Sequence, residues 1–97
     1  MVVAARTENR HEVEIQGRYR IGNGLAYDVT VTELSHYGCR IFNRFSNLAQ
    51  DRQISIRIGS IGPLFAQVRW REGDVVGIRF NQPLHPSVLE HMRYTLD

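Results

Sequence analysis

Hydrophobic and polar residues alternate along most of this chain, which is the period-two pattern of strands with one buried face. The alternation predicts six strands, at Glu12–Ile21, Leu25–Glu33, Cys39–Phe42, Gln53–Gly59, Leu64–Arg71 and Val76–Phe80. Turn sequences rich in Gly separate them, and Gly22-Asn23-Gly24 is the clearest, because Gly and Asn tolerate positive φ. Six short strands joined by such turns predict an all-β sandwich or barrel, and antiparallel closure would remove exposed strand edges.

Two positions inside these strands stand out. Gly17 interrupts the first alternating run and predicts a bulge or bend there. Trp70 falls on the same side of its strand as Ala66 and Val68, so the pattern makes it a filler of the core or of the barrel rim. A position at the rim would also let its indole stack on a bound base.

The two ends of the chain depart from the alternation. Residues 1–11 are polar and show no period, so we expect a flexible arm that is disordered without a ligand, followed by a single domain at 12–97. At the other end, Pro86 suits a first helical position, and Ser87 with Glu90 matches a capping box. An amphipathic helix over Pro86–Leu96 is expected to pack on the barrel.

Composition limits the class of protein. Ninety-seven residues with 42% hydrophobic and 23% charged residues make one ordinary globular domain. All twelve basic residues are Arg, which suits phosphate binding but equally reflects codons of a GC-rich genome. The net charge is only +2 and no basic–aromatic stripe is visible, so binding of a nucleic-acid polymer ranks low.

Several other classes are disfavoured by what the sequence lacks. Cys39 is the single cysteine, so no internal disulfide forms, and it reads as a small core residue. The first residues do not form a signal peptide, and no apolar run approaches the ~20 residues of a membrane helix. We therefore expect a cytoplasmic protein without membrane insertion. Paired carboxylates, metal-ligand spacings and a nucleophile elbow are missing, which predicts no enzyme activity and no cofactor.

Two short motifs carry candidate binding chemistry. Arg6 and Arg10 stand four residues apart in the arm, and two guanidinium forks there fit phosphate oxygens or the O6/N7 edge of guanine. Glu33, Ser35 and Gly38 end a strand and enter a turn, where Gly38 would let the backbone turn sharply. The carboxylate can accept hydrogen bonds from guanine N1–H and N2–H, and the hydroxyl and turn amides can bind phosphate. Arg18, Arg20 and Arg40 extend a basic surface or are simply the outward side of their strands.

Together these motifs resemble the PilZ domain, the bacterial receptor domain for cyclic di-GMP. Arg6 and Arg10 match the family's Arg-x-x-x-Arg motif, and Ser35 and Gly38 match its Asp/Asn-x-Ser-x-x-Gly motif. The likeness extends to Val68-Arg69-Trp70, to Val76-Gly77-Ile78-Arg79-Phe80 and to the C-terminal helix. Glu33 departs from the Asp or Asn of the second motif by one methylene.

The resemblance implies a six-stranded antiparallel β-barrel whose arm folds onto cyclic di-GMP and then presents a new surface to a protein partner. The residues implied to bind the ligand are Arg6, Arg10, Glu33, Ser35, Gly38 and Trp70. The alternative is a PilZ-like adaptor that contacts proteins but does not bind cyclic di-GMP, and Glu33 is the residue that favours it.

Overall fold

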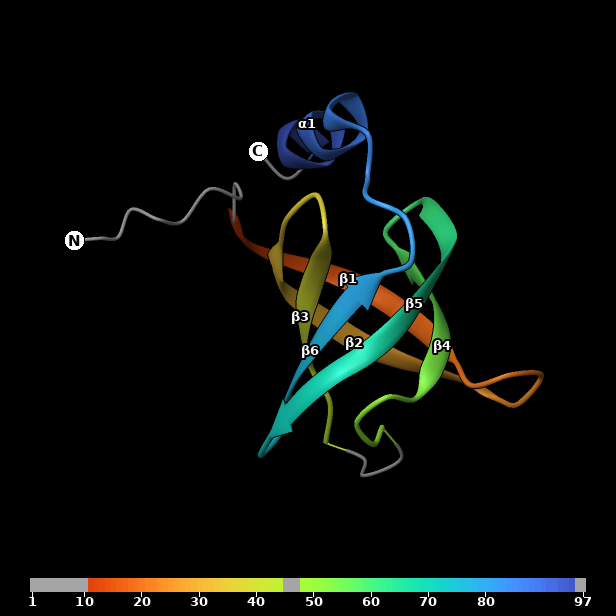
Figure 1. The fold of residues 1–97 in the computed structure, drawn as a ribbon. Helices are drawn as coiled ribbons and strands as arrows, with labels where there is room; N and C mark the ends of the chain where they lie inside the picture. Colours follow the sequence, from red (N-terminus) through yellow and green to blue (C-terminus); the bar gives the residue numbers. More distant parts are fainter. Residues whose placement is uncertain (1–10, 45–47, 96–97) are drawn as a thin grey trace.

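The chain folds as a closed barrel of antiparallel strands. The computed structural model describes residues 11–44 and 48–95. Within these residues the elements are β1 (His11–Arg20), β2 (Ala26–Leu34), β3 (Gly38–Phe42), β4 (Gln53–Ile58), β5 (Ile61–Glu72), β6 (Val75–Phe80) and α1 (Pro86–Thr95). The strands close in the order β1-β2-β3-β6-β5-β4, and α1 lies over one end of the barrel (Figure 1). The predicted barrel with a C-terminal helix is confirmed. The predicted flexible arm spans residues 1–11, of which residues 1–10 lie outside the described residues and His11 is the first residue of β1.

A single hydrophobic core fills the barrel. Alternate side chains of each strand point inward, and the barrel strands contribute side chains with no exposed surface, among them Val31, Ile41, Ile56, Val68 and Val76. Tyr19 is also fully buried, and its hydroxyl accepts a hydrogen bond of 2.7 Å from Asn43 Nδ2. The buried phenol therefore has a polar partner, which offsets the cost of removing its hydroxyl from water.

Gly17 does not mark the irregularity of β1. The register of β1 against β2 shifts upstream, between Glu12 and Ile15, while Gly17 pairs regularly with Val29 and with Ile58. Its role is close packing, because a Cβ at this position would lie 3.0 Å from the Arg57 carbonyl oxygen and 3.2 Å from Val31 Cγ2. The predicted bulge at Gly17 is thus wrong, and the missing side chain is explained by lack of room.

Strand β5 begins earlier than the alternation predicts. Ile61 already pairs with Ile58, and the ladder resumes at Leu64 opposite Ile56 after a register shift. The residues between them are Gly62, with φ of 124°, and Pro63, which cannot donate to a ladder. Both are tolerated at a bulge, and this is why a segment that reads as a turn belongs to the strand.

The helix is capped by a residue that the sequence pattern did not indicate. The carbonyl of His85 accepts hydrogen bonds from Val88 N and Leu89 N, and His85 Nδ1 accepts one of 3.1 Å from Ser87 N. His85 is therefore the N-cap, Pro86 occupies the first helical position as predicted, and Ser87 lies inside the helix rather than at its cap. Leu89 and Met92 are buried against the barrel.

The connection from β6 to α1 is tied to the loop between β2 and β3. Phe80 N donates to Tyr37 O at 2.8 Å, and Leu84 N donates to His36 O at 2.7 Å. Leu84 is itself buried, so the connection is held by backbone bonds and by packing. No helix among the residues that the structure describes combines the length and the apolar character needed to cross a membrane.

Candidate functional site

One row of residues across four neighbouring strands forms the candidate site. Glu33 on β2 pairs with Arg40 on β3, Arg40 pairs with Gly77 on β6, and Gly77 pairs with Trp70 on β5. Residues paired across adjacent strands share a face of the sheet, and this row lies on the outside of the barrel. Four segments far apart in the sequence thus bring an acid, a cation and an aromatic ring together.

A bulge in β5 turns Trp70 outward. Val68 pairs with Ile78 and Trp70 pairs with Gly77, so Arg69 is an extra residue between them. The extra residue reverses the alternation after Val68, and Trp70 is 36% exposed. The expectation that Trp70 shares the inward side of Val68 is therefore wrong. The ring lies on the outer face, where it is accessible to a ligand.

Gly77 lets the indole lie across β6. A Cβ on Gly77 would come within 2.2 Å of Trp70 Cε2 and 2.3 Å of its Nε1. Any side chain at this position would displace the ring. The glycine in the Val76–Phe80 segment is thus needed for this position of the Trp70 ring.

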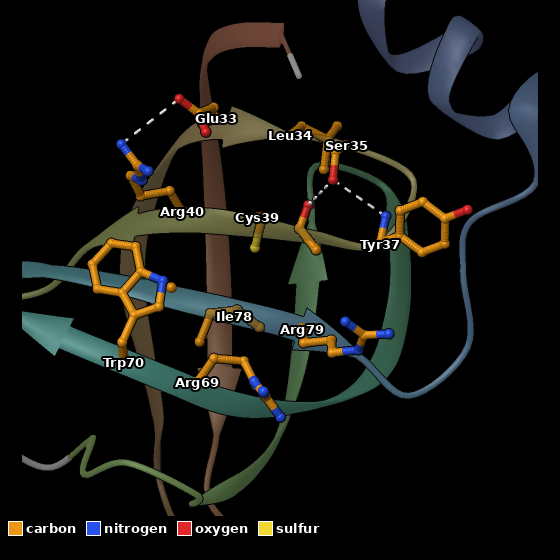
Figure 2. Close-up of a pocket in the computed structure, with 12 residues that line it drawn as sticks. Glu33, Leu34, Ser35, Tyr37, Cys39, Arg40, Arg69, Trp70, Ile78 and Arg79 are labelled. Carbon is orange, nitrogen blue, oxygen red and sulfur yellow. Dashed lines mark hydrogen bonds and ion pairs between the residues drawn. The ribbon is translucent and has the colours of Figure 1, made fainter. Parts of the chain in front are cut away.

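Arg40 stands between the acid and the ring. Its Nη1 lies 3.7 Å from Glu33 Oε2, and its guanidinium carbon lies 5.2 Å from the centroid of the Trp70 ring (Figure 2). Both side chains of the ion pair are partly exposed, so water weakens their attraction.

The loop after β2 forms the other side of the site. Ser35 is buried, and its Oγ accepts a hydrogen bond from Tyr37 N at 3.2 Å and donates to Gly38 O at 3.4 Å. Ser35 N also donates to Gly38 O at 2.9 Å. The serine hydroxyl therefore organises the loop, and this loop brings the Tyr37 ring to the rim of the site (Figure 2).

Gly38 is required for a reason other than the sharp turn that the sequence suggested. Its φ is not positive; instead a Cβ on it would lie 2.0 Å from the carbonyl oxygen of Ile78 on the neighbouring strand. β3 and β6 approach each other so closely here that no side chain fits.

These residues surround a pocket of about 280 Å³ on the outer wall. Four of the six residues predicted to bind ligand line it together, namely Glu33, Ser35, Gly38 and Trp70. The other two, Arg6 and Arg10, lie outside the described residues. The pocket is also lined by Tyr37, Arg40, Arg69 and Arg79.

Sequence reasoning missed Arg69, Arg79 and Tyr37 as candidates. Arg79 pairs with Gly38 two residues along β6 from Gly77, so it returns to the outer face. Its outward place in the Val76–Phe80 alternation was a usable signal. Arg69 follows the buried Val68, so the alternation of its strand also places it outward, and this signal was usable too.

Cys39 lies beneath the pocket and belongs to the core. It is 8% exposed, and burial raises the pKa of its thiol to about 12. Only the thiolate is a strong nucleophile or metal ligand, so this thiol is inert near neutral pH. Among the described residues, no three His, Cys, Asp or Glu side chains come together as metal ligands.

The raised pKa of Cys39 predicts a specific loss of stability in alkali. The unfolded chain releases the thiol proton near pH 9.0, whereas the folded protein keeps it until about pH 12. The contribution is therefore complete below pH 9 and falls as pH rises through this window, by up to about 1.4 kcal/mol per pH unit. Urea unfolding at pH 8 and pH 10.5 should show that the stability advantage of wild type over Cys39→Ala shrinks at the higher pH. An advantage that is equal at both values would contradict the assignment.

The family model of the PilZ domain matches residues 4–96, which is nearly the whole chain. A search of curated proteins found no match to this chain.

Proposed function

The chain belongs to the PilZ domain family, and from this premise we propose that its outer pocket binds cyclic di-GMP and that the bound form signals to a partner protein. The family is one of cyclic di-GMP receptors and adaptors, which are binding domains and not enzymes. The observation that carries the proposal is the convergence of Glu33, Ser35, Gly38 and Trp70 on one pocket.

The chemistry of the pocket suits the ligand. Cyclic di-GMP presents two phosphates and two guanines. Arg40, Arg69 and Arg79 supply planar cations for phosphate oxygens, and the exposed face of Trp70 offers a stacking surface for a guanine. The Glu33 carboxylate is an acceptor for guanine N1–H and N2–H.

In this proposal Arg6 and Arg10 complete the site from the arm. Their guanidinium groups close over the bound ligand, stack on guanine and pair with phosphate. Ordering a segment costs roughly 1–2 kcal/mol per residue, so several charge-assisted contacts must form at once. The closed arm is then the surface that a partner protein recognises.

Isothermal calorimetry tests the binding step. Cyclic di-GMP should give saturable heat, and cyclic di-AMP at the same concentration should not. Adenine lacks the N1–H and N2–H groups from which the Glu33 carboxylate would accept hydrogen bonds. Shifts in an NMR titration should fall on residues 33–40, 69–70 and 77–79. If millimolar cyclic di-GMP produces neither heat nor shifts, the chain is an adaptor that does not bind the ligand.

The length of the Glu33 side chain should tune the affinity. In the free protein its carboxylate is turned toward Arg40, and a longer side chain loses more rotamer freedom when it is held on guanine. Glu33→Asp is therefore expected to tighten binding by about 0.5–1.5 kcal/mol, and Glu33→Ala to weaken it. Calorimetry on the three proteins at one salt concentration measures both effects.

Glu72→Asp is the matched control for this series. Glu72 is exposed and does not line the pocket, so the same shortening there should leave the affinity unchanged. Equal affinities of wild type and both Glu33 variants would mean that the carboxylate does not touch the ligand.

A further inference from the structure

The wall of the barrel opposite the pocket carries a second hollow. The pocket spans β2, β3, β6 and β5, whereas this hollow of about 240 Å³ is centred on β1 and β4, on the other side of the closed barrel. It is lined by Arg18, Tyr19, Arg20, Ala26, Ser55, Arg57 and Pro63.

Strand pairing places cations side by side in this hollow. Arg18 on β1 pairs directly with Arg57 on β4, and Arg20 pairs with Ser55. Like charges on paired positions are unfavourable in a sheet. Arg18 is relieved by Asp28, whose Oδ1 lies 2.9 Å from its Nε. For Arg20 and Arg57, no carboxylate of the described residues lies within ion-pair distance.

Two large apolar side chains flank the cations. Phe65 on β5 pairs with Ser55 and is 67% exposed, and Leu25, next to the Arg20 partner Ala26, is 76% exposed. Neighbouring strands lie ~4.8 Å apart, so the row Ala26, Arg20, Ser55, Phe65 spans about 14 Å. An extended segment of about five residues covers that length. Exposed aromatic and Arg side chains together are typical of protein interfaces.

We infer that this Arg20–Phe65 face, defined as Arg18, Arg20, Leu25, Ser55, Arg57 and Phe65, docks an acidic segment of a partner protein. Carboxylates of the segment pair with Arg20 and Arg57, and apolar residues on either side cover Leu25 and Phe65. A protein segment fits better than a nucleic-acid polymer or a lipid surface. The chain has a net charge of only +2, and the cations occupy a short patch bounded by apolar groups rather than a long stripe.

The inference uses none of the residues of the cyclic di-GMP pocket and stands whether or not that pocket is occupied. Its location has a functional meaning all the same. A partner seated on the opposite wall leaves the pocket open, so the domain can hold both at once.

A phage-displayed library of 12-residue peptides tests the inference. Selection on the wild-type protein should enrich peptides that combine Asp or Glu with aromatic or aliphatic residues. The most enriched peptide, added to isotope-labelled wild-type protein, should shift the NMR signals of the backbone amides of residues 18–20, 55–57 and 65. Its affinity should fall at least tenfold for the double variant Arg20→Glu, Arg57→Glu, with folding checked by circular dichroism.

The matched control is the double variant Arg44→Glu, Arg52→Glu, which makes the same change in net charge at exposed residues outside both hollows. It should bind the peptide like wild type. Enrichment without acidic residues, no enrichment at all, or equal loss in both double variants would overturn the inference.

Two further arms separate other outcomes. Sedimentation with vesicles of phosphatidylserine and phosphatidylcholine that depends on Arg20 and Arg57, without peptide binding, would assign the face to lipid and reject a protein partner. Peptide titrations with and without cyclic di-GMP distinguish the two proposals, because failure of the pocket to bind nucleotide leaves peptide binding intact.

Discussion

The double variant Arg6→Ala, Arg10→Ala is expected to bind cyclic di-GMP at least 100-fold more weakly than wild type. Each guanidinium is proposed to make a charge-assisted contact worth about 1.5–3 kcal/mol, and 1.4 kcal/mol corresponds to a factor of ten in Kd. Either single variant should therefore lose at least tenfold. Calorimetry on the single and double variants at one ionic strength measures these losses, since phosphate contacts are sensitive to salt.

The control for this prediction removes the same charge elsewhere. Arg44 and Arg52 are exposed and line neither hollow, so their double replacement by Ala lowers the net charge equally without touching the pocket. Its affinity should stay within about twofold of wild type if the loss is local. Unchanged affinity in the Arg6, Arg10 variant would show that the arm does not close on the ligand, even if the pocket itself binds.

Gly38→Ala should be the most damaging single change to the fold among those that touch the pocket. The new Cβ would lie 2.0 Å from the Ile78 carbonyl oxygen and 3.1 Å from its carbonyl carbon, both of them backbone atoms that cannot turn aside. β3 and β6 must then separate, and overpacking of this kind costs about 3 kcal/mol. Urea unfolding should show this loss, and the Tm should fall by more than about 10 °C.

Gly77→Ala is the informative companion. The atoms that its Cβ would meet belong to the Trp70 side chain, which can rotate away. We expect a smaller loss of stability but a displaced indole, visible as a change in tryptophan fluorescence, together with weaker ligand binding. If the free energy of unfolding of Gly38→Ala lies within about 1 kcal/mol of the wild-type value, then β3 and β6 tolerate separation and the packing argument fails.

The alternation of the sequence predicted the strands, because each strand buries one face, as Ile54, Ile56 and Ile58 do on β4. It left a sandwich and a barrel open, and the resemblance to the PilZ domain is what favoured the closed barrel. The alternation failed where a residue is inserted into the ladder. The bulge at Arg69 changes which way Trp70 points. The pattern also failed at the start of α1, because the helix is capped by His85, a residue type outside the usual capping set.

The candidate site shows the same division. Glu33, Ser35 and Gly38 were found because they are close in sequence and form a motif. Arg69 and Arg79 were missed because strand pairing, and not sequence proximity, brings them to the pocket. The sequence indicated that Gly38 is needed for a sharp turn, whereas it is needed because β6 lies too close to β3 for a side chain. The distance between two strands cannot be predicted from the sequence of one of them.

The hydrogen bonds from Phe80 and Leu84 to the carbonyls of Tyr37 and His36 make the loop and the connection to α1 a single unit for local opening. The helix cannot detach at Leu84 without releasing the loop that holds Ser35, and the loop cannot rearrange without loosening the helix. Any molecule that binds the loop in the conformation held by these hydrogen bonds must, by mass action, also make detachment of the helix less frequent. The position of α1 is thereby linked to a loop that lines the pocket, although the pocket lining includes no residue of α1.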